Sequence, residues 1–264
     1  MTGGQRRAAF YSRGLAAAAL GICWLALTQT SAWADPSALW SIVHGRCVPH
    51  EEGGDGPGPC VSVDLAGGEK AGVAILKDLV GEAQMLAIPT RRISGIEDPQ
   101  MLAADAPNVF ADAWKAKKDV EGRLRRALPR EDVAIAINSE WRRSQNQFHL
   151  HVDCVAKNVA DALTGFVSLA DETWREAPVK LNGRTYLIRR LDSAAFADAE
   201  PIKLLVAGVD GARMDIGDYS LAAIGATFDG KPGFLLLADK LSPDGGGHAE
   251  DLEDHDCAIA QSAR

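Results

Sequence analysis

The chain has 264 residues, of which 47% are hydrophobic and 24% are charged, close to the averages of ordinary globular proteins. This composition excludes an intrinsically disordered, collagen-like or coiled-coil protein. The net charge of -8 argues against an extended nucleic-acid-binding surface, although a locally basic pocket is compatible with it.

The first 34 residues have the layout of a secretory signal. Three arginines precede an uncharged apolar run over residues 14–27, and small residues follow at positions 32 and 34, before a potential cleavage site after Ala34. The apolar run is shorter than the roughly 20 residues of a membrane-spanning helix, but an extension to Ala34 would allow an uncleaved anchor. We therefore predict a signal peptide or an N-terminal membrane anchor over residues 1–34, with the rest of the chain exported.

The exported part contains Cys47, Cys60, Cys154 and Cys257. The first two flank a polar stretch rich in glycine and proline, which indicates a disulfide that staples this loop in an oxidising compartment. The same reasoning pairs Cys154 with Cys257. Three connectivities are possible and this one is our prediction. A zinc site is the alternative, although the spacings do not resemble one.

Alternating apolar residues and turn signals predict an antiparallel meander early in the exported part. Its strands cover residues 61–65, 72–76 and 85–89. A helix follows from Pro107 to about Leu128, and Pro129 ends it. Strands over residues 133–137 and 147–153, joined by a loop, complete an α+β half over residues 35–154.

Residues 155–264 repeat this order of elements more loosely. A helix begins at Lys157, strands cover residues 179–181 and 185–190, a helical stretch lies near residues 201–209, and strands follow over residues 219–228 and 233–238. We therefore predict an α+β fold whose second half is a degenerate pseudo-repeat without the chemistry of the first. The acidic C-terminal tail is expected to be loop-like until Cys257 anchors it.

The strongest candidate site lies on the strand over residues 147–153. Side chains alternate along a strand, so Gln147, His149, His151 and Asp153 are expected on one side, with the apolar residues between them packed on the other. We expect the imidazoles to remain unpacked. Two histidines two positions apart have Cβ atoms about 7 Å apart and can touch one phosphate group or one metal ion. The preceding residues 142–147 add arginines and uncharged donors, which suits phosphoryl transfer.

A metal site is the main competing interpretation of this strand. His149 and His151 would be ligands, with Asp153 as a third. The amide-rich approach favours an anion over a cation, so no metal is predicted. The remaining histidines and the pair Lys77–Asp78 are interpreted as surface or half-buried residues without a catalytic role.

A set of motifs across the chain is recognisable: Leu39–Pro49, Leu76–Asp78, Ile88–Ile93, Pro107–Asn108, Ala136–Ser139 and Ser144–His151. This set resembles the bacterial CDP-diacylglycerol pyrophosphatase family, which is similar to the histidine-triad superfamily. The resemblance implies a histidine-triad-like antiparallel sheet with helices, in a protein of the bacterial cell envelope.

The resemblance also implies hydrolysis of CDP-diacylglycerol to CMP and phosphatidate without a cofactor. By similarity to the superfamily, His149 attacks the nucleotide phosphate to form a nucleotidyl-histidine, and His151 holds phosphate oxygens. The implied substrate-binding residues are Asn138, Ser144, Gln145 and Gln147. Gln147 stands where the superfamily has a histidine, and it cannot protonate a leaving group. A backbone carbonyl near Asn138 is expected to orient His149.

Two other functions stay open at this point. One is a nucleotidyltransferase that passes CMP to an acceptor other than water, and the other is an exported metal-binding protein that uses His149 and His151. The oligomeric state is not indicated. The implied substrate lies in an anionic membrane, while the exported part is acidic, so contact with the membrane surface requires the anchor or an exposed apolar patch. Candidates for the patch are Trp40, Trp114, Trp141 and Trp174.

Overall fold

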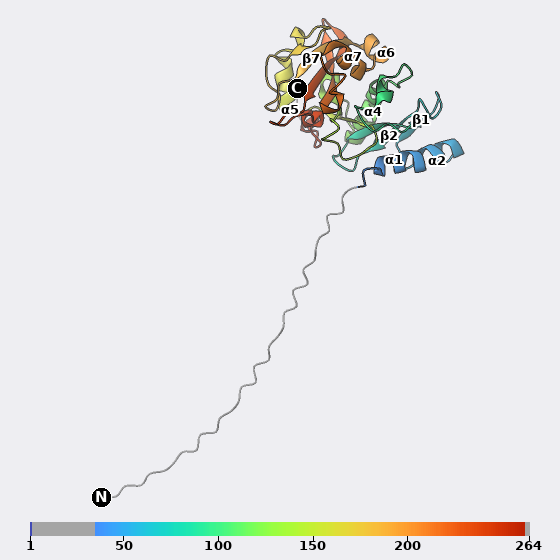
Figure 1. Ribbon diagram of the computed structural model, residues 1–264. Helices are drawn as coiled ribbons and strands as arrows, with labels where there is room; N and C mark the ends of the chain where they lie inside the picture. The colour runs from blue at the N-terminus through green and yellow to red at the C-terminus, as the bar shows by residue number, and fades with distance from the viewer. Residues whose placement is uncertain (2–34, 262–264) are drawn as a thin grey trace. The chain divides into compact units, whose positions relative to one another are not determined.

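A single antiparallel sheet organises the computed structural model, which describes residue 1 and residues 35–261 (Figure 1). Its strands are β1 (Ser62–Asp64), β2 (Val73–Lys77), β3 (Met85–Pro89), β4 (Val133–Ile137), β5 (Leu150–Cys154), β6 (Arg175–Glu176), β7 (Leu187–Asp192), β8 (Tyr219–Phe228) and β9 (Lys231–Lys240). The strand order is β1-β2-β3-β5-β4-β8-β9-β7-β6, and all neighbours are antiparallel. The α+β class is therefore confirmed.

Helices connect and cover these strands. They are α1 (Ala38–Ile42), α2 (Val48–Gly53), α3 (Val109–Lys115), α4 (Lys117–Leu124), α5 (Lys157–Thr164), α6 (Ser193–Asp198), α7 (Pro201–Gly208) and α8 (Ala258–Gln261). Short 3₁₀ turns add η2 (Pro99–Leu102), η3 (Arg130–Asp132), η4 (Val167–Leu169), η5 (Ile216–Asp218) and η6 (Ala249–Leu252). In the described part of the chain, none of the helices has the length and apolar character needed to cross a bilayer. The predicted leader over residues 1–34 lies, apart from Met1, outside the described residues.

Several elements differ from the sequence prediction. The predicted helix over residues 107–128 is two helices, α3 and α4, which meet at Ala116. Residues 38–53 form α1, a π-helical turn (Val43–Cys47) and α2, where no helix was predicted. The predicted strand over residues 179–181 is absent, and an isolated bridge joins Leu181 to Arg184 instead. These segments are short, so contacts with the rest of the fold override their local sequence patterns.

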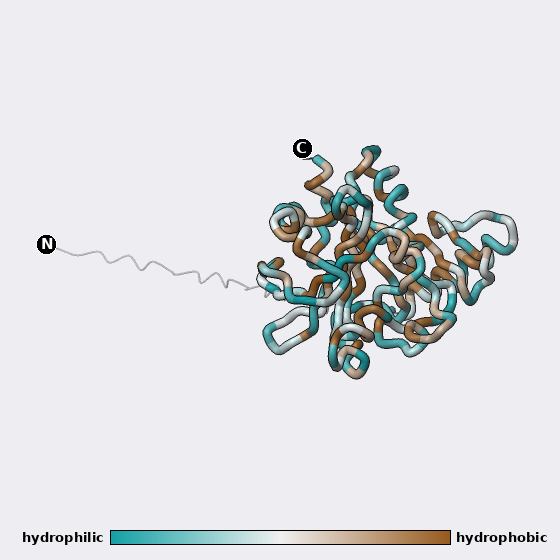
Figure 2. The backbone as a smooth tube through the Cα atoms, turned by 90° about the horizontal axis from the view of Figure 1, so that it is seen from above, coloured by the Kyte–Doolittle hydropathy of each residue, from teal (hydrophilic) through white to brown (hydrophobic). Residues whose placement is uncertain are grey.

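The two faces of the sheet bury different apolar clusters. One face and the helices α3, α4, α6 and α7 share the largest cluster, which includes Phe148, Leu150 and Val152 as predicted. The other face carries two smaller clusters, one under α1 and α2 and one under α5. Figure 2 shows the hydrophobic segments of the chain concentrated in the interior of the molecule. The strip of the second face between its two clusters is where the candidate site lies.

The strands of both predicted halves belong to this one sheet. In each half two strands, a pair of helices and two more strands follow one another, and the equivalent strands β4 and β8 meet at the centre of the sheet. Strand β9, the counterpart of β5, contains no histidine. The described residues 35–261 belong to one compact unit, so the two predicted halves are not separate bodies. The likeness of the halves is topological, and the pseudo-repeat stays a prediction.

Two disulfides tie distant parts of the chain to the sheet. Cys47 is joined to Cys60, and Cys154 to Cys257, which is the predicted pairing. The first fastens the N-terminal helical segment beside β1, and the second fastens the C-terminal tail to the end of β5. Because all four sulfurs are in disulfides, the alternative zinc site at these cysteines is wrong.

Candidate active site

A pair of imidazoles stands at the start of β5. His149 immediately precedes the strand, which begins at Leu150 rather than at Gln147 as predicted, and His151 lies within it. In the sheet His151 pairs with Leu86 on one side and with Ala136 on the other. The two rings are edge to face, with centroids 5.0 Å apart. Only 8% of His149 and 7% of His151 is exposed, so the expectation of unpacked imidazoles was wrong.

His149 is oriented by its own chain. Its Nδ1 lies 2.7 Å from the carbonyl oxygen of Gln147, so Nδ1–H donates to that oxygen and Nε2 remains unprotonated. The orienting carbonyl is therefore that of Gln147, not one near Asn138 as expected. Burial, and secondarily the neighbouring His151, lowers the pKa of His149 to about 4. The imidazole is neutral at pH 7, which is the form that can act as a nucleophile.

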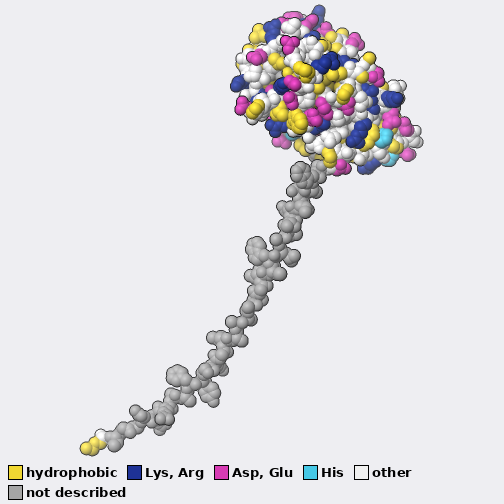
Figure 3. All heavy atoms as spheres, viewed as in Figure 1, with side chains coloured by type: hydrophobic (Ala, Val, Ile, Leu, Met, Phe, Trp, Pro, Cys, Tyr) yellow, Lys and Arg dark blue, Asp and Glu magenta, His cyan; other side chains and the backbone are white. Residues whose placement is uncertain are grey.

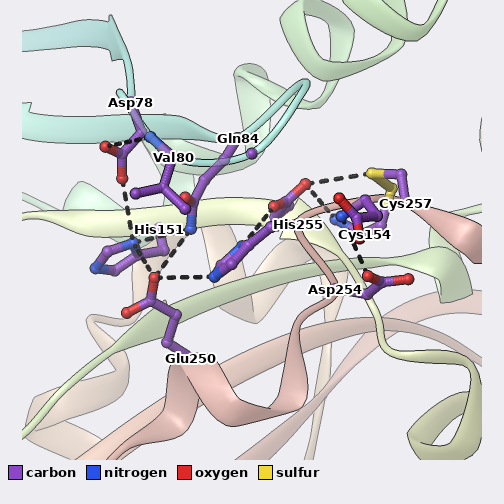
Figure 4. A network of polar contacts seen from close by, with 12 residues as sticks. Asp78, Val80, Gln84, His151, Cys154, Glu250, Asp254, His255 and Cys257 are labelled. Carbon is purple, nitrogen blue, oxygen red and sulfur yellow. Dashed lines mark hydrogen bonds and ion pairs between the residues drawn. A yellow bond between two sulfur atoms is a disulfide. The ribbon is translucent and has the colours of Figure 1, made fainter. Parts of the chain in front are cut away.

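His151 is bound to a carboxylate instead (Figure 4). Its Nδ1 lies 3.2 Å from Oε1 of Glu250 and 3.9 Å from Oδ2 of Asp78. The side-chain amide of Gln84 donates to the same Glu250 oxygen over 3.2 Å and lies 3.0 Å from His151 Nδ1. Burial lowers the pKa of His151 to about 4, although the charge of Glu250 opposes this. This ring, too, is neutral at pH 7.

Glu250 is held in place from two sides. Nδ2 of Asn138 donates to Oε2 of Glu250 over 2.9 Å, and the backbone N–H of Glu250 donates to Oδ1 of Asn138 over 3.2 Å. Burial acts to raise the pKa of Glu250, but His151 and the bonds from Asn138 and Gln84 outweigh it and lower that pKa. Glu250 is therefore an ionised carboxylate in a largely buried site.

The network continues from Glu250 toward the end of β5. His255 Nε2 lies 3.5 Å from Oε1 of Glu250, and its Nδ1 lies 3.0 Å from Oδ2 of Asp153. The hydrogen bond to Asp153 raises the pKa of His255. Asp153 is thus paired with a histidine of the C-terminal tail rather than with His149 and His151.

The C-terminal tail reaches the site through a glycine turn. Gly245, Gly246 and Gly247 have φ angles of 107°, 95° and 69°, which residues with a Cβ rarely adopt. The N–H of Ser139 donates to the carbonyl of Gly247 over 2.9 Å, which docks the turn beside Asn138. The tail is therefore part of the site, which the sequence analysis did not predict. The sequence analysis missed Asp78, Gln84, Glu250 and His255, and the one available signal was the pairing of histidines with acids at residues 248–256.

The side-chain amides of Gln145 and Gln147, both predicted to bind substrate, form hydrogen bonds to backbone groups instead. Nε2 of Gln147 donates to the carbonyls of Pro89 and Arg91, each over 3.0 Å. Gln145 accepts from the N–H of Leu39 over 3.1 Å and donates to the carbonyl of Asp35 over 3.0 Å. Both side-chain N–H groups of Gln147 therefore donate to backbone carbonyls.

Two pockets that share Arg143 lie near His149. The inner pocket has a free volume of about 10 Å³, which is room for about one water molecule, and is lined by Gly95, Ile137, Asn138, Arg143, Gln147, Phe148 and His149. The outer pocket is open, with a volume of about 520 Å³, and is lined by Trp141, Arg142, Arg143, Ser144, Gly246, His248 and Asp251. Ser144 and Asn138, both predicted to bind substrate, therefore belong to different pockets.

Arg143 stands between the two pockets. Its guanidinium forms a bidentate ion pair with Glu97, with N–O distances of 2.6 and 2.9 Å. A Cβ at Gly95 would collide with the ends of both side chains, so a larger residue there would displace the ion pair. Arg143 is the cation that lines the inner pocket beside His149.

Metal ligation is possible at one group of side chains next to the pair. Ligand atoms of His151, Glu250 and Glu253 lie within 4.8 Å of one another, whereas His149, His151 and Asp153 do not form such a group within residues 35–261. Glu253 is buried, and burial raises its pKa well above the ordinary value. Burial thus disfavours the ionised carboxylate that metal ligation requires.

The fold and the site together define an α+β protein with a buried, carboxylate-backed histidine pair on a central strand. Residues 34–261 match the family CDP-diacylglycerol pyrophosphatase. A CDP-diacylglycerol pyrophosphatase of Yersinia pestis is 38% identical over 229 residues, which is 86% of each chain. The chain therefore belongs to the CDP-diacylglycerol pyrophosphatase family, as its motifs predicted.

Proposed function

We propose that this protein hydrolyses the pyrophosphate bond of CDP-diacylglycerol and releases CMP and phosphatidate. The observation that carries the proposal is the state of His149: a neutral imidazole, fixed by Nδ1–H donation to Gln147, in a pocket lined by an arginine. Membership of the family supplies the substrate class.

In the proposed first step Nε2 of His149 attacks the phosphorus of the CMP moiety. A nitrogen–phosphorus bond forms, the bond to the bridging oxygen breaks, and its electron pair leaves with phosphatidate. The Nδ1 proton stays on the ring and continues to donate to Gln147. In the second step water cleaves the nucleotidyl-histidine and releases CMP.

The replacement of the superfamily histidine by Gln147 is compatible with this chemistry. The leaving group is a phosphate monoester, whose second pKa is about 6, so it departs at neutral pH without a proton donor. Gln147 is instead a support, because its amide joins the carbonyls of Pro89 and Arg91.

Arg143 is proposed as the group that receives the pyrophosphate. The inner pocket accommodates about one water molecule, so a phosphate enters only if the side chain of Arg143 moves. A phosphate can replace Glu97 as the bidentate partner of the guanidinium. Ser144, in the outer pocket, is proposed to contact the substrate beyond it.

We place the protein in the cell envelope. The two disulfides are typical of an oxidising compartment. The substrate is proposed to reach the site from a membrane surface, to which residues 1–34 would hold the protein if they are retained.

The experiment measures CMP release from CDP-diacylglycerol in detergent micelles containing EDTA. We expect wild-type activity to survive the chelator and to fall at least about 10³-fold in His149→Ala, because the nucleophile is lost. His44→Ala is the matched control, since His44 is half-exposed and contacts Glu69. Loss of activity on chelation would support the metal alternative, and transfer of CMP to added glycerol would support the transferase.

A further inference from the structure

We infer that Glu250 and His151 form a carboxylate–imidazole pair in which His151 is the general base for the water-consuming second step. The inference rests on the nucleotidyl-histidine proposed for His149. It assigns a positioning role to Glu250, in the C-terminal tail, and gives His151 a task beyond contact with phosphate.

The first argument is that Nδ1 of each ring faces the protein. Nδ1 of His149 lies 2.7 Å from the carbonyl oxygen of Gln147, and Nδ1 of His151 lies 3.2 Å from Oε1 of Glu250 and 3.0 Å from the amide nitrogen of Gln84. No Nε2 partner of either ring is found among the described residues. The ring centroids are 5.0 Å apart, so a phosphorus atom bonded to one Nε2 is within reach of a water held by the other ring. Both Nε2 atoms are therefore available for chemistry on the same phosphate.

The second argument is the difference between the two acceptors. His149 donates to a neutral carbonyl, whereas His151 faces an ionised carboxylate. A carboxylate on Nδ1 fixes the tautomer with a free Nε2 and stabilises the imidazolium that forms when Nε2 accepts a proton. The geometry thus distinguishes a nucleophile, His149, from a base, His151.

The third argument is the way Glu250 is restrained. Asn138 contacts Glu250 at both the carboxylate and the backbone N–H, and Gln84 donates to the oxygen that faces His151. Oε1 of Glu250 lies within 3.2 Å of both Nε2 of Gln84 and Nδ1 of His151, and it is the one of these three atoms that can only accept, so we assign the proton of His151 to Nδ1, facing that oxygen. These contacts restrain the Glu250 carboxylate to one position beside His151.

The proton and electron changes of the step balance. The water oxygen bonds to phosphorus as its proton passes to Nε2 of His151. The bond between phosphorus and Nε2 of His149 breaks, and its electron pair returns to His149, which becomes neutral. CMP leaves, and the imidazolium of His151, paired with Glu250, releases its proton to solvent.

The pair is needed in the second step and not in the first. Phosphatidate leaves without a proton, but water is a far weaker acid and must lose a proton as it attacks. Removal of Glu250 is therefore expected to slow hydrolysis of the intermediate and to leave its formation nearly unchanged.

The test is rapid-quench kinetics with CDP-diacylglycerol labelled at the CMP phosphorus, comparing wild type with Glu250→Gln. In the variant we expect one phosphatidate per enzyme to be released within about threefold of the wild-type rate, and CMP release to slow about 10²-fold or more. Label should accumulate on His149 as an alkali-stable adduct. Hydroxylamine, a nucleophile that needs no base, should restore turnover.

Two further variants complete the design. His151→Asn removes the base and is expected to trap the same adduct, which keeps the test valid if Glu250→Gln does not fold. Glu69→Gln, a half-exposed glutamate that contacts His44, is expected to behave as wild type.

The outcomes separate this inference from the proposed function. Equal slowing of both products, with no adduct in either variant, would overturn the role of the Glu250–His151 pair. The stereochemical outcome at a chiral phosphorothioate of the substrate then tests whether the reaction passes through a covalent intermediate. Retention by the wild type would preserve the covalent route through His149, and inversion would overturn that route as well.

Discussion

The protonation of His149 is controlled by burial more than by any single neighbour. Removal from water lowers its pKa from the ordinary value of 6.5 to about 4, and the hydrogen bond to Gln147 only partly opposes this shift. Glu250 and Asp78, the acids near the pair, also act to raise that pKa but do not restore it. The nucleophile therefore needs no base to be ready at neutral pH.

This state predicts the acid limb of the pH profile. A nucleophile with a pKa of about 4 is unprotonated above pH 5, so kcat/KM should be constant from about pH 7 to 5 and fall as the pH drops through 4. The measurement is kcat/KM in micelles as a function of pH, and the control is that activity recovers when an acid-treated sample is returned to pH 7. Recovery matters because the unfolded chain binds protons below pH 6.5 that buried His149 does not, so stability also declines with acid. An apparent pKa near 6.5 would contradict the assignment.

At the scale of elements, the C-terminal tail completes a site that begins on β5. Strand β5 supplies His151 and Asp153, and the tail supplies Glu250 and His255. The disulfide between Cys154 and Cys257 closes a sequence separation of 103 residues next to these contacts. The disulfide adds a covalent restraint to the apolar packing of the tail, in which Leu252 and Ile259 are buried.

The two disulfides are expected to differ in their effect on activity. Replacing Cys154 and Cys257 by serine should cost about 4–5 kcal/mol of unfolding free energy and, where the protein stays folded, at least a tenfold loss of kcat, because Glu250 is released. Replacing Cys47 and Cys60, which span 13 residues, should cost about 3 kcal/mol with kcat within threefold of wild type. The measurements are denaturant unfolding and CMP release for both double variants. Equal losses of kcat would contradict the link between the tail and the site.

At the scale of the whole molecule, exposed apolar side chains border the site. Leu79 and Val80 directly follow Asp78 and are exposed, and Trp141, on the rim of the outer pocket, is 65% exposed. Of the other tryptophan candidates, Trp114 and Trp174 pack against the core. Charges of both signs are interspersed on the face drawn in Figure 3. A membrane contact by this protein would therefore rely on a few apolar residues and not on a basic surface.

This arrangement predicts an interfacial effect of the loop after β2. Leu79→Ser with Val80→Ser should lower activity on CDP-diacylglycerol in anionic vesicles about tenfold, since insertion of these side chains is lost. Activity on a short-chain soluble analogue should stay within twofold. Met214→Ser, which removes an exposed apolar side chain outside the site, is the control. An equal loss on both substrates would indicate damage to Asp78 rather than loss of membrane contact.

Patterns that are local in the sequence predicted much of this protein. Alternation identified the strands that became β2, β3, β4 and β5, and it assigned Phe148, Leu150 and Val152 to the buried side of the last. Turn composition around the cysteines led to the correct disulfide pairs. Such features depend on neighbours within a few residues, or on the chemistry of a single residue type, and both are visible in a sequence.

The sequence by itself thus determined the fold class, the family motifs and the histidine pair. Only the tertiary structure decided what surrounds that pair. Glu250 lies about a hundred residues from His151 along the chain, and the positive φ angles of three glycines and a disulfide bring it within 3.2 Å. Contacts across such separations leave no periodic signal, because the partners lie on elements whose order in the sheet is set by packing of the whole chain.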